Sequence, residues 1–288
     1  MKQEIDFIKC SPTQNMTLLV RTDHASEHYS DIASSLMSYD HVHAEQVGFI
    51  KQTRRPEAVA RLEMAGGEFC GNACMALAAH IAAEAGLEKQ ASMNIKLDVS
   101  GTERLISCQV KRREHRYDCR VTMPVPDQIE RRKITFEGME LETVIVRYAE
   151  FIHIVIEVQH VDDLMKRKAE HLARLLGLTM GDKMIGVLLY HPATQEMAPL
   201  IYVPQLDSLI WERGCGSGTA SVGAYQAWLR QSEVTQSVKQ PGGAIKVTAQ
   251  WGSQGVKAIT IEGTVGIVAY GTAFIDTLQE QSRSVVEV

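Results

Sequence analysis

Alternating hydrophobic and polar residues run along much of this chain, which is the pattern of β-strands that bury one face. This pattern, or a run of β-branched residues, predicts strands at 16–21, 45–51, 59–64, 94–99, 104–111, 118–123 and 133–137. Farther along, it predicts strands at 184–190, 199–203, 245–250 and 257–270, and residues 141–158 are long enough for two more. The protein is therefore expected to be rich in β-sheet.

Four segments carry a helical pattern instead. Residues 24–38 and 161–176 are amphipathic and have acidic residues near their starts, so we expect two surface helices there. Residues 71–85 and 216–229 are small and apolar on nearly every side. Helices of that kind are buried, and their small side chains let neighbouring strands approach closely.

A Cys-Gly pair directly precedes each of the two buried helices, as Cys70-Gly71 and as Cys215-Gly216. The two pairs lie about half a chain length apart, which predicts two structurally similar halves. The boundary is expected near Pro124 and Pro126, because prolines interrupt strand pairing. A cleft between two such halves is a natural ligand site.

Composition and charge limit which class of protein this chain can be and which partners it can have. Hydrophobic residues make up 45% and charged residues 23% of the chain, which is typical of a folded globular protein. The 30 Lys and Arg against 35 Asp and Glu leave a net charge of -5, which argues against nucleic acid and anionic membranes as partners. No stretch approaches 18 apolar residues and the N-terminus lacks the form of a secretory signal, so we expect a cytoplasmic protein with reduced cysteines.

A cysteine at the start of a helix lies near unpaired NH groups and the positive end of the helix dipole, which lowers the pKa of its thiol. The same NH groups bind a carboxylate, and a glycine beside them lets the ligand approach the backbone. Cys70 and Cys215, facing one cleft, would suit inversion of a carbon next to a carboxylate. One thiolate would remove the α-proton and the other thiol would return a proton to the far face, so no cofactor is needed.

We expect the other four cysteines to be packing residues: Cys10, Cys74, Cys108 and Cys119. The chain has no C-x2-C pair, so no metal site is expected. His80 and His153 are interpreted as core residues with hydrogen-bond partners. A thiol-based redox or metal-binding protein without isomerase activity is the alternative from a different class.

Two sequence blocks resemble the active-site motifs of the cofactor-independent diaminopimelate epimerase and proline racemase superfamily: GGEFCGNACMAL at 66–77 and WERGCGSGTAS at 211–221. PGGAIKV at 241–247 resembles a further diaminopimelate epimerase motif. The resemblance implies an α+β fold with two pseudo-symmetric domains, each a curled, mainly antiparallel, barrel-like sheet around a central α-helix. It implies domains at 1–124 plus 272–288 and at 125–271, with Cys70 and Cys215 as acid and base in the cleft between them.

The chain departs from diaminopimelate epimerases where they recognise the far end of their substrate. It has Phe151-Ile152-His153 where they have Asn-Pro-His, lacks a second distal Asn around 185–187, and lacks their residues between Gly214 and the second cysteine. The blocks NMTLLV, EQVGFI, FCGNA, PLIYVP, SLIWE, CGSGTAS and PGG resemble instead the histidine racemases of staphylopine-type metallophore synthesis. This resemblance implies conversion of L-histidine to D-histidine without pyridoxal phosphate, for an opine-type metal chelator.

The resemblance also implies which residues surround the substrate. We expect substrate-binding roles for Asn15, Glu45, Gly71, Asn72, Glu212, Arg213, Gly216, Ser217 and Gly218. The glycines, Asn72 and Ser217 would meet the α-carboxylate and amino group. Glu45 either accepts a hydrogen bond from the imidazole NH or is a solvated strand carboxylate, and Glu212 with Arg213 either lines the site or forms a structural ion pair.

The expected partner is thus a small-molecule substrate, histidine, with no metal and no other cofactor. The nearest alternative is the same two-thiol chemistry on diaminopropionate, lysine or diaminopimelate. The sequence leaves open whether the chain forms a homodimer and which cysteine attacks L-histidine.

Overall fold

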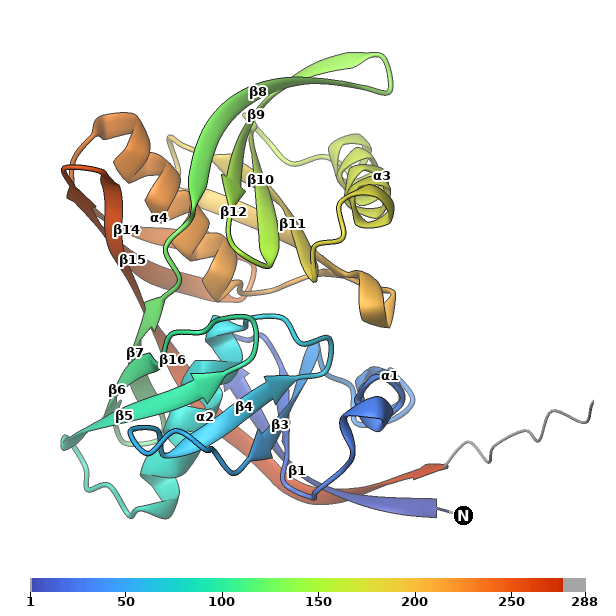
Figure 1. Cartoon of the computed structure of the whole chain (residues 1–288), viewed down its shortest axis with the longest axis vertical. Coiled ribbons are helices and arrows are strands. Elements are labelled where there is room, and N and C mark those ends of the chain that lie inside the picture. Colours follow the sequence, from blue (N-terminus) through green and yellow to red (C-terminus); the bar gives the residue numbers. More distant parts are fainter. Residues whose placement is uncertain (1, 277–288) are drawn as a thin grey trace, which may run out of the picture.

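The computed structural model describes residues 2–276 and shows two lobes that share one long strand (Figure 1). The lower lobe contains β1 (Lys2–Pro12), β2 (Thr17–Val20), α1 (Tyr29–Met37), β3 (Gln46–Lys51), β4 (Ala60–Met64), α2 (Gly71–Glu84), β5 (Ser92–Val99), β6 (Ile106–Arg112) and β7 (Tyr117–Met123). The upper lobe contains β8 (Gln128–Phe136), β9 (Met139–Arg147), β10 (Phe151–Glu157), α3 (Asp163–Thr179), β11 (Met184–His191), β12 (Glu196–Val203), β13 (Ser208–Trp211), α4 (Gly216–Arg230), β14 (Val234–Gln240) and β15 (Gly243–Gly252). The shared strand is β16 (Gly255–Asp276).

The two lobes repeat one plan. In the first lobe, α1 connects the parallel neighbours β2 and β3, and α2 connects β4 and β5. In the second, α3 connects β10 and β11, and α4 lies between β12 and β14, which are also parallel neighbours. The other strand pairs are antiparallel, so the sheet-rich α+β class and its two-fold repeat are confirmed.

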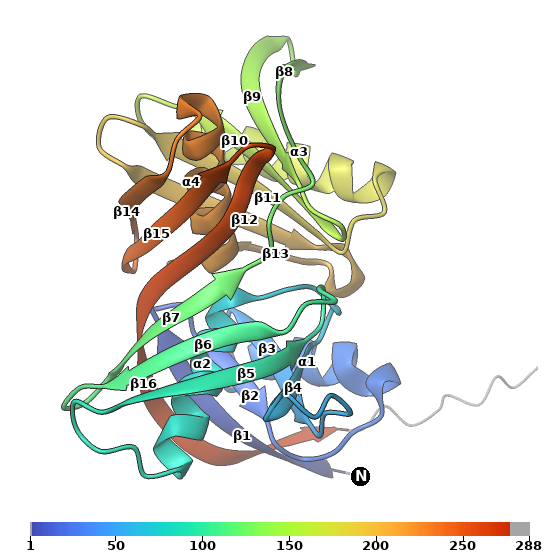
Figure 2. The same ribbon diagram turned by 60° about the vertical axis from the view of Figure 1, so that its left-hand side comes forward.

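The helices α2 and α4 form the centres of the lobes. The sheet of each lobe curls around its helix (Figure 2), and nearly every residue along both helices is buried. Small side chains make this possible: a Cβ atom on Gly223 of α4 would lie 2.5 Å from Cγ2 of Val247 on β15. The buried position of both segments confirms the expectation drawn from their composition. Within residues 2–276, no helix is both long and apolar enough to span a membrane.

The strand β16 passes from one lobe to the other. Its residues 255–262 pair with β15, residues 259–265 pair with β7, and residues 265–276 pair with β1. We therefore propose that the chain returns to the first lobe near Gly263, before the boundary at residue 271 expected from the sequence. Residues 277–288 of that expected domain lie outside the described part of the chain.

Most of the expected elements are present, with shifted ends. The segment 24–38 is divided into a 3-10 turn at Ser26–His28 and helix α1, while 141–158 holds the two strands β9 and β10. The alternation did not predict β13 or β14. The four residues of β13 are all half-buried, so they carry no alternating pattern, and β14 reads VTQSVKQ with mostly polar residues.

Candidate active site

Each cysteine of the two Cys-Gly pairs caps a central helix. Cys70 and Cys215 have extended backbones at the N-caps of α2 and α4. The NH of Ala73 donates to the Cys70 sulfur, and the NH of Gly218 donates to the Cys215 sulfur, each over 3.3 Å. A sulfur thus takes the place of the hydroxyl or carboxylate oxygen that usually caps a helix. The repeated Cys-Gly pair therefore reflects two equivalent helix starts.

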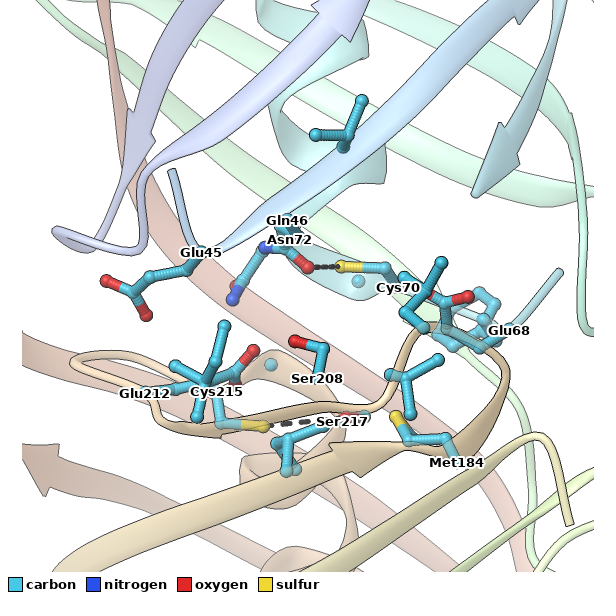
Figure 3. A pocket seen from close by; sticks show the side chains of 18 of the residues that line it. Glu45, Gln46, Glu68, Cys70, Asn72, Met184, Ser208, Glu212, Cys215 and Ser217 are labelled. Carbon is cyan, nitrogen blue, oxygen red and sulfur yellow. Dashed lines mark hydrogen bonds between the residues drawn. The ribbon is translucent and has the colours of Figure 1, made fainter. Parts of the chain in front are cut away.

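Both thiols open into one pocket between the lobes (Figure 3). Cys70 reaches it from the first lobe and Cys215 from the second, and the helices that follow them, α2 and α4, are in contact. A Cβ atom on Gly216 would lie 3.1 Å from Oδ1 of Asn72, so any larger residue would have to displace the Asn72 side chain. The wall consists of Met37, Glu45, Gln46, Val47, Glu68, Phe69, Cys70, Gly71, Asn72, Met184, Ile201, Val203, Leu206, Ser208, Ile210, Glu212, Cys215, Gly216 and Ser217.

The two thiols have different hydrogen-bond partners. The Cys70 thiol donates to Oε1 of Gln46 over 2.7 Å. The Cys215 sulfur lies 3.5 Å from the hydroxyl of Ser217. Burial raises the pKa of Cys215, and the neighbouring Glu212 carboxyl raises it further. Cys70 is thus paired with a neutral amide and Cys215 with an ionisable carboxyl.

The pKa of neither thiol is lowered, contrary to the expectation for a cysteine at a helix start. Burial raises the pKa of Cys70 and of Cys215, and the negative charge of Glu212 raises both further. The NH groups of Ala73 and Gly218 lower these values but do not outweigh the loss of water around the sulfur atoms. A helix dipole favours a thiolate, but burial of the sulfur away from water disfavours it more.

Three carboxyl groups surround the thiols, all with a raised pKa. Burial raises the pKa of Glu45 to about 7, that of Glu68 to about 7 and that of Glu212 to about 8. Backbone NH groups, among them that of Arg213, partly offset the shift at Glu45, and Cys215 and Asn15 do so at Glu212. Near neutral pH each of these carboxyl groups is therefore only partly ionised, and it can exchange a proton with a ligand in the pocket.

Several acceptor atoms at the pocket have no hydrogen-bond partner. They are Oε2 of Glu68, Oδ1 of Asn72 and Oε2 of Glu212. Buried acceptors without partners cost free energy, so a ligand that brings several donors would be stabilised here. Within residues 2–276, no group of three or more His, Cys, Asp and Glu side chains is arranged to hold a metal ion.

The structure brings most of the sequence-predicted residues into one wall. Glu45, Gly71, Asn72, Glu212, Gly216 and Ser217 line the pocket with the two cysteines. Three others lie behind or beside it. Asn15 is fully buried and donates to the carbonyl of Gly214, Gly218 donates to Cys215 from behind, and the exposed Arg213 side chain turns away to Oε1 of Gln14.

Sequence reasoning missed Gln46 and Glu68. Alternation on a strand would place Gln46 on the face opposite Glu45, but β3 begins only at Gln46, so both side chains reach the pocket. Glu68 stands two residues before Cys70, in a turn between a buried strand and a buried helix. A carboxylate in such a place was the available signal.

The two histidines expected in the core lie there. His153 is fully buried, with Nδ1 bonded to the Ser221 hydroxyl over 2.6 Å, and burial lowers its pKa to about 3. Nε2 of His80 lies 3.3 Å from the Glu84 carboxylate, one turn along α2. Neither lines the pocket.

Comparison with known proteins decides the family. A family model described as the histidine racemase CntK N-terminal domain matches residues 4–274. The chain belongs to the histidine racemase family. A histidine racemase from Staphylococcus aureus is 35% identical over 280 residues, which cover 96% of this chain and 99% of that one. A histidine racemase from Fusobacterium nucleatum is 26% identical over 274 residues, covering 95% and 98%. The protein is thus an amino-acid racemase, an isomerase that acts on a small molecule.

Solved structures agree on the fold. A hydroxyproline epimerase from Agrobacterium vitis superposes with a TM-score of 0.67 at 11% identity, covering 96% of this chain and 94% of that one. A probable proline racemase from Agrobacterium radiobacter gives a TM-score of 0.68, also at 11% identity, with 97% and 94% covered. This racemase therefore has the fold that the resemblance of its two motifs implies.

Proposed function

We propose that this racemase interconverts L-histidine and D-histidine by passing protons through Cys70 and Cys215. The observation that carries the proposal is that both thiols cap facing helices and line one pocket. A substrate held between them would present one face of its α-carbon to each sulfur. Its α-carboxylate would lie at the two helix starts, where the first NH groups have no partner within the helix.

The proton transfers balance without any further reagent. One cysteine thiolate takes the α-proton, and the electron pair of the broken C–H bond moves toward the carboxylate. NH groups aimed at that carboxylate stabilise the developing charge, an effect for which a single donor typically contributes roughly 100-fold to 1000-fold in rate. The second thiol then gives its proton to the opposite face of the α-carbon and becomes the thiolate.

Glu212 would activate Cys215 in this scheme. Its carboxyl acts directly on the Cys215 thiol, and its pKa is about 8, whereas burial raises the pKa of Cys215 well above the ordinary value of a thiol. The proton therefore stays on sulfur in the substrate-free pocket. It would move to the ionised carboxylate when the α-ammonium group of the substrate lies beside the sulfur and lowers the pKa of Cys215, so that a thiolate forms without releasing a proton to water. Oε2 of Glu212 and Oδ1 of Asn72 would accept from the substrate α-ammonium group.

The excess of acceptors favours an amino acid whose side chain donates hydrogen bonds. With Glu45, Glu68 and Glu212 in the wall, the ligand must bring more donors than acceptors. Lysine and diaminopropionate do so with two ammonium groups, and histidine does so with its ammonium group and an imidazole NH. We assign that NH to Glu45, which lies on the far side of the thiol pair from Glu68 (Figure 3). The chain-long likeness to histidine racemases supports the same substrate.

A panel of L-amino acids followed by chiral chromatography tests the substrate. We expect D-histidine to form, and not D-lysine, D-diaminopropionate or meso-diaminopimelate. Deuterated water tests the mechanism, because the product α-position should gain deuterium. Cys70→Ala and Cys215→Ala should each abolish racemisation. Activity in either variant would exclude the two-thiol mechanism.

The place of the reaction in metabolism is part of the proposal. By its resemblance to the staphylopine-type enzymes, D-histidine would serve an opine-type metal chelator assembled in the cytoplasm. Deletion of the gene should remove a D-histidine-containing chelator from the culture medium, and added D-histidine should restore it. No effect of the deletion on chelator output would contradict this role.

A further inference from the structure

Gln46 is the only side-chain hydrogen-bond acceptor that the described residues give the Cys70 thiol. The amide of a glutamine can face a thiol with its oxygen, which accepts the S–H, or with its nitrogen, which would donate to a thiolate. The two orientations therefore favour opposite protonation states of the same cysteine. In this structure the oxygen faces the sulfur, over 2.7 Å.

Two acceptors fix that orientation from the other end of the amide. Nε2 of Gln46 donates to Oδ1 of Asn15 over 2.5 Å and to the hydroxyl of Thr17 over 3.0 Å. Both atoms are committed as acceptors. Nδ2 of Asn15 donates to the carbonyl of Gly214 over 2.8 Å, and the Thr17 hydroxyl donates to the carbonyl of Asn15 over 3.2 Å.

The direction of the whole chain of hydrogen bonds is thus set by backbone carbonyls, which only accept. Turning the Gln46 amide over would break both of its anchoring bonds and bring its oxygen against two other acceptor atoms. A neutral hydrogen bond contributes about 1 kcal/mol, and an unpaired buried group costs more. Since Asn15 and Thr17 are fully buried, water does not replace the lost partners.

We propose that Gln46 is a positioning residue that holds Cys70 in its protonated form, as the acid of the thiol pair. The inference rests on the proposed two-thiol function. Gln46 is not titratable, so it cannot take the proton as Glu212 can at Cys215. The charged groups facing Cys70, Glu212 and Glu68, act in the same direction because their negative charges also raise the pKa of this thiol.

The two cysteines therefore begin the reaction in different protonation states. Cys70 enters as the thiol that protonates the carbanion, while Cys215 enters as the base. After one conversion, the Cys70 thiolate faces the Gln46 oxygen, which does not donate to it. This form is higher in energy than the starting form. Cys70 therefore regains a proton, either from the α-carbon of the product in the reverse reaction or from water while Cys215 gives up the proton it gained.

Alkylation of the full-length, substrate-free enzyme tests the role of Gln46. Iodoacetamide reacts with thiolates, and peptide mass spectrometry gives the rate at each cysteine. Gln46→Met keeps the size of the side chain and removes the acceptor. We expect the rate at Cys70, measured at one pH below the thiol pKa, to rise about tenfold, which corresponds to a pKa about one unit lower. The rate at Cys215 should change less than about twofold, within the scatter of a non-contacting change.

A second variant and an internal control separate this role from a structural one. Thr17→Val removes one anchor of Nε2 without touching the sulfur, and should raise the Cys70 rate by about threefold, a smaller change in the same direction. Cys74, fully buried one turn along α2, should stay unreactive in both variants. An unchanged or slower Cys70 rate in both variants would overturn the proposal, and so would a rise shared by Cys70 and Cys74, because it would show that the helix start had opened.

The failure of this proposal is distinct from failure of the proposed function. If Cys70→Ala and Cys215→Ala are inactive but Gln46→Met leaves the Cys70 rate unchanged, the two-thiol mechanism stands and the role of Gln46 falls. If either alanine variant still racemises histidine, the proposed function falls whatever the alkylation shows.

Discussion

Nδ2 of Asn72, in the first lobe, donates a hydrogen bond to the carbonyl of Gly214, in the second, over 2.7 Å. The same carbonyl accepts from Nδ2 of Asn15 over 2.8 Å. One backbone oxygen beside Cys215 therefore receives two side chains from the opposite lobe. These contacts keep the two thiol-bearing helix starts together while leaving Oδ1 of Asn72 free at the pocket.

Replacement of Asn72 should uncouple the lobes. Asn72→Leu keeps the side-chain size but removes both the donor to Gly214 and the acceptor at the pocket. We expect kcat/KM for histidine to fall at least about tenfold, with a loss of about 1 kcal/mol in the free energy of unfolding. Chiral chromatography and urea denaturation measure the two effects. Full activity in a folded variant would show that this contact does not position the substrate.

The close approach of the two helices predicts a steric effect at Gly216. In Gly216→Ala, the new Cβ atom would lie 2.9 Å from Cδ1 of Ile261 and 3.1 Å from Oδ1 of Asn72. Such overpacking typically costs about 1 to 3 kcal/mol and would shift the NH groups that meet the carboxylate, so activity should fall by about tenfold or more. Gly266→Ala is the control, because a Cβ atom there meets no neighbour within 4 Å. Equal effects of the two substitutions would contradict the explanation.

Loss of the carboxyl beside Cys215 should slow the chemical step. Glu212→Gln keeps the shape of the side chain but cannot take the proton of the thiol. We expect kcat to fall by roughly 100-fold or more, the usual contribution of a general acid or base, with a smaller change in KM. The pH profile of kcat/KM, which reports groups of the free enzyme, should also lose its dependence on the group whose pKa is about 8. A change confined to KM would instead make Glu212 a binding residue only.

The buried carboxyl groups predict that stability falls as the pH rises. The pKa of Glu212 is about 8 and that of Glu68 about 7, against an ordinary value of 4.5 in the unfolded chain. Between these limits the folded state binds more protons than the unfolded one, so the free energy of unfolding decreases from about pH 4.5 through about pH 8. Each pKa unit corresponds to about 1.4 kcal/mol.

Urea denaturation of the substrate-free enzyme across this range measures that trend. Glu212→Gln should flatten it, because its amide does not ionise. A slope unchanged by the substitution would contradict the raised pKa of this group. The comparison of parent and variant is decisive because the lowered pKa of His153 makes stability rise with pH in both proteins alike.

The two outer carboxylates predict where the imidazole lies. Glu45→Gln should raise KM for histidine about tenfold or more, the usual effect of losing a hydrogen bond to a charged group. Glu68→Gln, at the other end of the pocket, should raise KM by less than about threefold. The reverse order would place the imidazole beside Glu68.

The fold was predictable because burial and composition agree. The segments that become α2 and α4 are small and apolar on nearly every side, so they have no face suited to water and must be buried. Cys-Gly marks the start of both helices. The direction in which the thiol pKa shifts was not predictable, because it depends on how completely water is excluded from Cys70 and Cys215. Gln46 was missed for a related reason: its role follows from contacts with Asn15 and Cys70, which lie far from it in sequence.

The strand β16 makes the two lobes inseparable. Since residues 265–276 complete the first lobe by pairing with β1, a fragment ending at Pro124 would keep β2 but lack the second neighbour of its own N-terminal strand. The complementary fragment would carry that strand end with nothing to pair it. We therefore expect the two halves of this molecule to unfold together, so that a cut which separates them would remove both thiols from the pocket.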